Sequence, residues 1–160
     1  MRSQSIQPSQ VLIVLDLGGF TIQPNPNVGS ILVAGVAVLA NPTASKITIQ
    51  NGSIYAFWNG IAVNPNTSTQ STIYVANVHI QNINFNYNRF VNVAFNQTNN
   101  SSLADCVFLG GTLTGIQDAY SQTGNHFSNI SFNIGQNTAI QIIANGSVGG
   151  RFKTSQWGSN

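Results

Sequence analysis

A six-residue pattern recurs along this chain, and it limits the possible folds more than any other feature of the sequence. The first and last positions of the pattern are apolar, and the third is Asn, Asp or Gly. Five clear copies, which we call boxes, occupy residues 17–22, 49–54, 80–85, 103–108 and 127–132, and a weaker sixth occupies 148–153. A supersecondary unit that recurs at a spacing of 20 to 50 residues is typical of a solenoid, in which each repeat stacks on the next.

A second β-like run follows each of the five clear boxes. These runs begin at Gly35, Gly60, Phe90, Gly115 and Ala139. Gly, Asn and Pro separate the runs, and no segment shows the sustained 3.6-residue periodicity of a helix. The pattern therefore predicts a single all-β domain over residues 1–160, built as a parallel β-solenoid of about six coils.

Equivalent box residues would form rows along such a solenoid, because parallel strands stack about 4.8 Å apart. The first and last box positions predict two inward rows, which contain Leu17, Ile49, Ile80, Leu103 and Phe127, and Ile22, Ile54, Phe85, Phe108 and Phe132. The third position marks a bend, where Asn, Asp and Gly tolerate left-handed backbone angles. We expect a turn ladder there, formed by Gly19, Asn51, Asn82, Asp105 and Asn129, with Gly150 as a weaker sixth member. Stacked amides can bond from coil to coil in such a ladder.

A β-sandwich or jelly roll is the alternative fold that also contains many short strands. Its strands would alternate without a fixed box, and a shared Asn turn position would have no reason to recur. The repeat therefore favours the solenoid.

The residues VLDLGGFTIQ from Val14 and KITIQNGSIYAFWNGIAV from Lys46 resemble the pectate-lyase-like, right-handed parallel β-helix repeat family. The segments LADCVFLGGTLTGIQ from Leu103 and HFSNISFNIGQNTAIQI from His126 resemble its later coils. The resemblance extends from about Val11 to Ala144 and implies a right-handed parallel β-helix. It implies no single activity, because the family includes lyases, hydrolases, esterases, phage tailspikes and surface proteins.

The composition excludes several classes of function. Only 5% of the residues are charged, the net charge is +2, and the five Lys and Arg are scattered, so we expect no nucleic-acid partner. No run of 18 apolar residues occurs, so we expect no membrane insertion. The single Cys106 excludes an intrachain disulfide and a Cys-based zinc site, and we expect no cofactor.

The carboxylates do not suggest a catalytic centre. The chain has no Glu, and its three Asp residues, Asp16, Asp105 and Asp118, fall in different coils. Glycoside hydrolysis needs two carboxylates within about 10 Å of each other, and a calcium site needs several oxygen ligands. The paired Asp residues and the Gly-His-Gly motif of the polygalacturonase-like branch are missing. We expect Asp16 to bond locally in a turn and Asp105 to replace Asn in the ladder, whereas Asp118 has no evident structural role.

His79 and His126 both directly precede a box, so they are expected to project from the same sheet two coils apart. Thr48, Ser102 and Ser147 occupy the matching positions. A serine–histidine pair on neighbouring coils is geometrically possible, but no acid is placed to orient the imidazole. We interpret these residues as solvent-facing, and Cys106 as a core filler.

The aromatic residues offer a candidate glycan surface. We select Tyr55, Trp58 and Tyr120 as possible glycan contacts, because exposed rings can stack on sugars. The alternative is that Tyr55 to Trp58 packs beneath a loop. Neither end of the chain shows an evident cap. We therefore expect a non-catalytic structural β-helix of an extracellular, cell-surface or virion assembly that self-associates as a homo-oligomer or filament. The alternative is a carbohydrate-binding or residual carbohydrate-active β-helix that binds polysaccharide.

Overall fold

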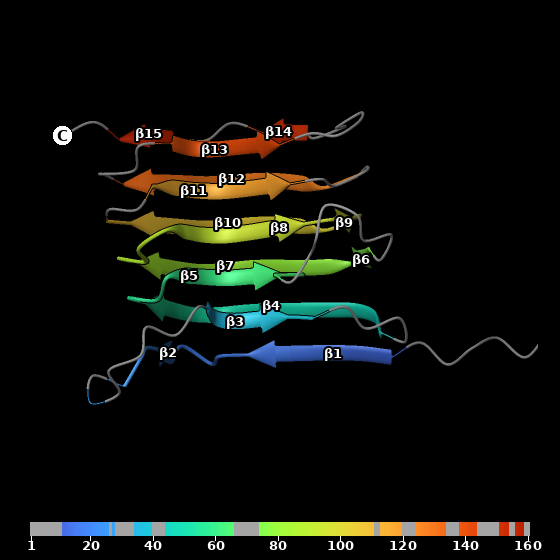
Figure 1. Cartoon of the computed structure of the whole chain (residues 1–160), viewed down its shortest axis with the longest axis horizontal. Helices are drawn as coiled ribbons and strands as arrows, with labels where there is room; N and C mark the ends of the chain where they lie inside the picture. Colours follow the sequence, from blue (N-terminus) through green and yellow to red (C-terminus); the bar gives the residue numbers. More distant parts are fainter. Residues whose placement is uncertain are drawn as a thin grey trace, which may run out of the picture.

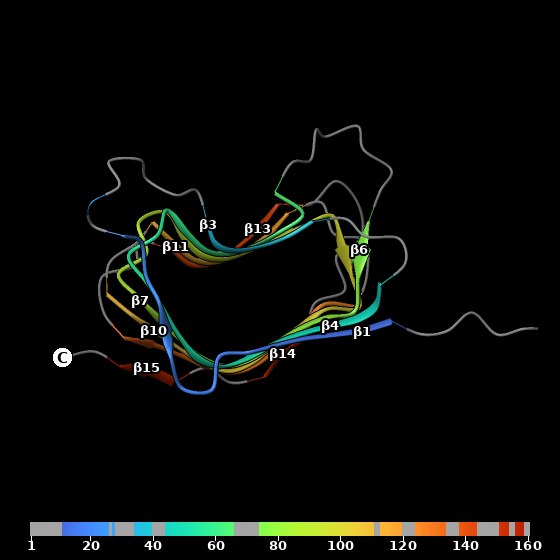
Figure 2. The ribbon, with the colours of Figure 1, turned by 90° about the horizontal axis from the view of Figure 1, so that it is seen from below.

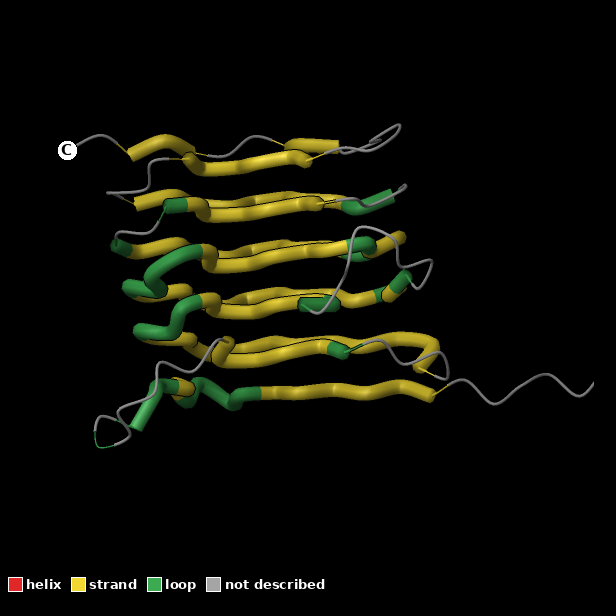
Figure 3. Tube along the Cα trace, in the orientation of Figure 1, coloured by secondary structure: helices red, strands yellow, loops and turns green. Residues whose placement is uncertain are grey.

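The structure is a computed structural model that describes residues 11–25, 27, 34–39, 44–65, 74–110, 113–119, 124–133, 138–143, 151–153 and 156–158. This part of the chain contains strands and loops but no helix (Figure 3). The absence of helix agrees with the sequence, in which short apolar runs alternate with Gly, Asn and Pro.

The strands form two main sheets. The large sheet has the order β1 (Val11–Asp16), β4 (Ala44–Tyr55), β7 (Val78–Asn86), β10 (Ser102–Leu109), β12 (His126–Asn133) and β14 (Arg151–Lys153), with β2 (Thr21–Ile22) on β4 and β15 (Gln156–Gly158) on β12. The small sheet has the order β3 (Ala34–Val38), β5 (Asn59–Val63), β8 (Val91–Asn96), β11 (Thr114–Ala119) and β13 (Thr138–Ile143). A separate short pair joins β6 (Val75–Ala76) to β9 (Thr98–Asn99).

The chain alternates between the two sheets as it advances. From β4 to β13, each strand of the large sheet is followed by a strand of the small sheet, and we call each such pair a rung. We call β1 with β3 the first rung, and β14 with β15 the last rung. The rungs stack in sequence order, from β1 at one end of Figure 1 to β14 at the other. Seen along the stack, the small sheet faces the large sheet (Figure 2). The architecture is thus all-β with parallel sheets, consistent with a β-solenoid.

Every strand pair in the described part of the chain is parallel. A β-sandwich or jelly roll is built from antiparallel sheets, so this alternative is wrong.

The central rows follow the predicted register. Ile49 pairs with Ile80, Ile80 with Leu103, and Leu103 with Phe127. The second row, from Ile22 to Phe132, also follows its predicted order. Within it, the ring centroids of successive phenylalanines lie 5.0 and 5.1 Å apart. The core is therefore a set of apolar columns that one rung could not bury by itself.

The turn ladder is confirmed at four of its positions. Asn51, Asn82, Asp105 and Asn129 all have left-handed backbone angles, with φ between 51° and 62°. The Asn82 Nδ2 donates to Asn51 Oδ1 at 2.9 Å, and the Asn129 Nδ2 donates to Asp105 Oδ1 at 2.6 Å. Residue type at this position is thus set by backbone conformation and by amide stacking together.

The first box was predicted two residues out of register. Leu15, and not Leu17, pairs with Ile49, whereas Ile22 still pairs with Ile54. The segment 17–20 therefore adds two residues to the bend. Leu17 is buried against Gly52, where a Cβ atom would overlap its side chain. Leu17 thus fills the space that, in later rungs, is filled by larger side chains at the position equivalent to Gly52.

The extra residues also change the ladder at Gly19. Gly19 has the expected left-handed conformation, with φ of 87°, and its N–H donates to the Asn51 carbonyl at 2.7 Å. The Asn51 side chain, however, donates to the carboxylate of Asp16. Asp16 therefore ends the ladder in place of Gly19.

The weak sixth box was placed four residues too early. Phe152 pairs with Phe127, and Trp157 pairs with Phe132, so the last repeat covers residues 152–157. Arg151 occupies the position next to His126 that was predicted for Ser147. Gly150 and Ser147 lie outside the described residues.

Candidate functional site

The edge of the large sheet at β1 carries more exposed large apolar residues than any other described strand. Its five apolar residues, Val11, Leu12, Ile13, Val14 and Leu15, are between 38% and 63% exposed. In the middle of the same sheet, Ile80 and Leu103 are fully buried. In the described part of the chain, β1 pairs only with β4, so its other edge is unpaired. An unpaired apolar edge is a template for another strand.

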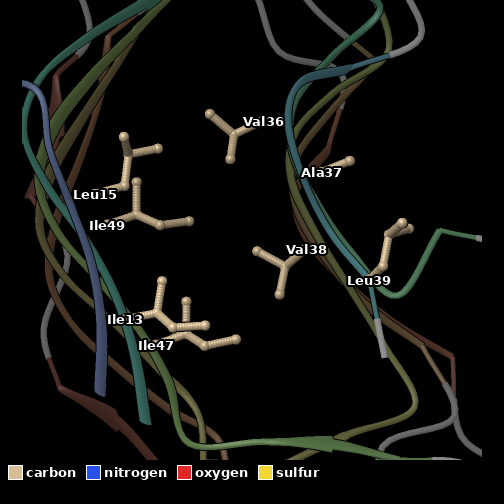
Figure 4. Close-up of a pocket in the computed structure, with 8 residues that line it drawn as sticks. All are labelled: Ile13, Leu15, Val36, Ala37, Val38, Leu39, Ile47 and Ile49. Carbon is tan, nitrogen blue, oxygen red and sulfur yellow. The ribbon is translucent and has the colours of Figure 1, made fainter. Parts of the chain in front are cut away.

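An apolar hollow of about 260 Å³ lies behind this edge, between the two sheets. Figure 4 shows Ile13 and Leu15 of β1 beside Ile47 and Ile49 of β4, facing Val36 and Val38 of β3. Ala37 and Leu39 also line the hollow, and Leu39 is 57% exposed. Among the described residues, no further rung covers the core beyond β1 and β3.

A polar groove lies on the outer face of the large sheet. It contains His79, whose Nδ1 lies 2.8 Å from Ser102 Oγ on the next strand. Its other lining residues are Leu12, Val14, Lys46, Thr48, Gln50 and Gln81. Partial burial, and secondly the charge of Lys46, lower the pKa of His79. The sequence indicated the His79–Ser102 pair but missed Lys46 and the two glutamines, whose only signal is their outward position beside this pair.

This pair does not form a hydrolase triad. Such a triad needs a carboxylate that stabilises the charged imidazole, whereas both influences on the His79 pKa favour the neutral ring. The groove can donate and accept hydrogen bonds, but none of the described residues that line it is a carboxylic acid.

The three aspartates have separate structural roles. Asp16 accepts hydrogen bonds from Gln50 Nε2 at 2.8 Å and from its own turn at Gly18 N, and these bonds lower its pKa. Asp105 belongs to the turn ladder. Asp118 is buried at an inward position, paired with Phe95, and lies 3.2 Å from Asn125 Nδ2. The expectation for Asp16 and Asp105 is confirmed, and Asp118 contributes to the interior.

Cys106 is a buried core residue, as predicted. Burial raises the pKa of its thiol to about 12, so the reactive thiolate is not populated near neutral pH. Among the described residues, no three His, Cys, Asp or Glu side chains are grouped so that they could hold a metal ion. No helix of the described chain could cross a membrane.

The predicted glycan contacts lie at the bend that follows the large sheet. Tyr55 and Trp58 are 41% and 42% exposed. Tyr55 meets the exposed ring of Tyr87 edge to face at 6.0 Å, and Trp58 stacks on Phe90 at 5.5 Å. Tyr87 was not selected from the sequence: it lies two residues after its box, whereas Tyr55 directly follows its own box and pairs with Asn86. Tyr120 lies outside the described residues.

Comparisons of the chain with protein-family models, with curated proteins and with solved structures gave no match. The resemblance to pectate-lyase-like repeats therefore stays a prediction from the sequence motifs, and a function has to be argued from the surfaces described above.

Proposed function

We propose that this chain is a structural subunit of an extracellular, cell-surface or virion assembly, and that it self-associates through the end of its strand stack. The observation that carries the proposal is the exposed apolar first rung. Leu12 and Leu15 lie on an unpaired strand edge, next to an apolar hollow. Covering this surface with another chain would remove apolar area from water, which is favourable by about 25 cal/mol per Å².

We further propose that the fold is a right-handed parallel β-helix. Support comes from the alternation between two parallel sheets and from the regular advance of one strand per sheet in each rung. Connections between parallel strands of one sheet are right-handed in about 98% of cases. A solenoid of this kind suits a structural subunit, because its end rung presents the same backbone pattern as its interior rungs.

The chemistry of the surface also supports a structural role. Low charge reduces repulsion between copies, and the chain has a net charge of only +2. Each carboxylate side chain already accepts hydrogen bonds within the fold.

The test is sedimentation of the full chain between about 1 and 200 μM, a range that brackets ordinary protein–protein affinities. We expect oligomers that dissociate when Leu15, which is inward on β1, is changed to Lys. Leu113→Lys is the matched control, because Leu113 is 48% exposed but lies next to β11 in the middle of the small sheet. Circular dichroism establishes that both variants fold. A wild-type chain that remains monomeric throughout, or equal loss in both variants, would contradict the proposal.

A second candidate function is polysaccharide binding, which the adjacent exposed rings of Tyr55 and Tyr87 favour. Tyrosine combines an apolar ring with a polar hydroxyl and so suits a sugar surface. Binding to a glycan array that is lost in Tyr87→Ala and Trp58→Ala but kept in Leu113→Ala would support it. Absence of binding by the wild-type chain would exclude it for the glycans on the array.

A further inference from the structure

The row of residues that begins at Asp16 has opposite charges at its two ends. Asp16 is on β1 at one end of the large sheet, and Lys153 stands at the equivalent register position on β14 at the other end. The strand register gives this row as Asp16, Gln50, Gln81, Ala104, Ser128 and Lys153. The four residues between the two ends are uncharged, so each end carries its charge alone.

Asp16 ends two chains of amides that donate towards it. Gln81 Nε2 donates to Gln50 Oε1 at 2.8 Å, and Gln50 Nε2 donates to Asp16 Oδ2 at 2.8 Å. Asn82 donates to Asn51, which in turn donates to Asp16. A carboxylate accepts hydrogen bonds and offers none. A group that approaches Asp16 from beyond the first rung must therefore be a donor, and a cation fits best.

The neighbouring row also ends with a cationic residue type, although it begins with an apolar one. It begins at Val14 on β1 and ends at Arg151 on β14. Its members in between are Thr48, His79, Ser102 and His126. By sequence and register, β14 thus contains two cationic residue types, Arg151 and Lys153, whereas β1 contains one anionic residue, Asp16.

Two rows whose middle members are buried begin and end with apolar residue types. In the large sheet, the row that starts at Leu15 ends at Phe152. In the small sheet, the row that starts at Val36 ends at Ile140. A β1 strand placed against β14 of another copy would therefore continue the apolar column of the large sheet. Among the described strands the small sheet ends at β13, in the rung of β12, so the contact is made through the large sheet.

We propose that the partner of the first rung is the last rung of a second copy of this chain, stacked head to tail in register, with Asp16 of one copy beside Lys153 of the next. The inference deepens the proposed function and rests on it. A tail-to-tail contact would place the cationic residues of two β14 strands together, and like charges on adjacent strands are destabilising. A head-to-head contact would offer Asp16 no cationic residue from the β1 strand of the other copy. A head-to-tail contact leaves one free end of each kind and so extends into a filament.

The test is a charge exchange, with association measured by sedimentation at about 50 mM salt, where screening is weak. We expect Asp16→Lys and Lys153→Asp each to weaken self-association about tenfold, because each turns an attraction into a repulsion. An equimolar mixture of the two variants, and the double variant D16K/K153D, recover association to within about threefold of the wild type. At about 1 M salt the differences disappear.

The two single variants distinguish the orientations. If copies met head to head, Lys153→Asp would associate like the wild type, and if they met tail to tail, Asp16→Lys would do so. Either result, or a mixture that does not recover, overturns the head-to-tail arrangement while leaving self-association intact. A wild-type chain that does not associate at all instead contradicts the proposed function itself.

A folding control is needed because Asp16 also accepts the ladder hydrogen bonds. Asp16→Asn keeps an oxygen acceptor and removes the charge, so we expect it to weaken association about threefold, less than Asp16→Lys does. Thermal melting shows which variants fold. If Asp16→Lys fails to fold, Asp16→Asn and Lys153→Asp still decide the outcome.

Discussion

The first strand of the large sheet and the strands in its middle have the same inward pattern but differ in what covers them. Leu15 and Leu103 lie in one row, yet Leu15 is 38% exposed and Leu103 is fully buried. The residue types are alike, so composition does not explain the difference. In a stack of rungs an inward residue is buried by the rungs above and below it, and in the described part of the chain β1 has a neighbouring strand on one side only. An end rung thus has the apolar side chains of a core but is covered by a neighbouring rung on one side only.

The largest expected effect separates these two leucines. Leu103→Ala is expected to lower the free energy of unfolding by about 3 kcal/mol, because it removes buried apolar area and leaves a cavity between two rungs. Leu15→Ala is expected to cost about 1 kcal/mol in the monomer, because part of the side chain is already in water. Urea denaturation at a concentration where the chain is monomeric measures both.

The same pair of variants also reports on assembly. When the measurement is repeated at a concentration where the chain is assembled, the cost of Leu15→Ala should rise towards that of Leu103→Ala. Equal costs in the monomer would mean that the first rung is covered by its own chain, and the comparison between the two regions would fail.

The second expected effect compares the ladder in the middle with its first rung. Asn82→Ala forces alanine to φ of 53° and removes an amide hydrogen bond, which together cost about 2 kcal/mol. Gly19→Ala imposes a similar backbone strain, but no atom lies within 4 Å of the added Cβ, so it costs about 1 kcal/mol.

Asn82→Gly isolates the hydrogen bond of the ladder, because glycine adopts the left-handed conformation without strain. Thermal melting of the three variants should rank Asn82→Ala as the least stable. If Asn82→Gly were as damaging as Asn82→Ala, backbone strain would contribute nothing, and the preference for Asn at this position would reflect only the amide.

The sequence predicts the middle of the molecule well because several constraints coincide there. Between Ile80 and Phe132, each box has its apolar residues and its left-handed position at constant spacing, so a shifted register would violate both. The side-chain contact between His79 and Ser102 followed from the same alignment.

The first and last boxes were misaligned because the apolar positions and the left-handed turn position do not keep the same spacing there. Leu15 and Leu17 are both apolar, and the two added residues of the first bend leave no trace in the pattern. At the other end, Thr154 replaces the expected Asn, so the true repeat beginning at Phe152 does not match the box. Lys46 and Lys153 were missed because each is a single residue, and its role becomes evident only when the strand register shows which residues lie beside it.

The smallest expected effect concerns the outer face, where the row begins with exposed Val14 and places His79 between Thr48 and Ser102. Burial and the charge of Lys46 lower the pKa of His79 in the folded chain below its ordinary value of 6.5. As the pH falls below 6.5, the unfolded chain therefore binds a proton that the folded chain resists. Stability from this group is complete above pH 6.5 and decreases until the folded pKa is passed.

The measurement is the difference in free energy of unfolding between pH 8 and pH 5 for the wild type and for His79→Gln. The wild type should lose more stability than the variant, and other titrating groups cancel because they are common to both chains. Lys46→Gln should reduce the loss without removing it, because burial remains the larger cause. If His79→Gln lost as much stability as the wild type, the imidazole would titrate alike in the folded and unfolded chain. His79 would then be as exposed to water in the middle of the stack as Val14 is on β1.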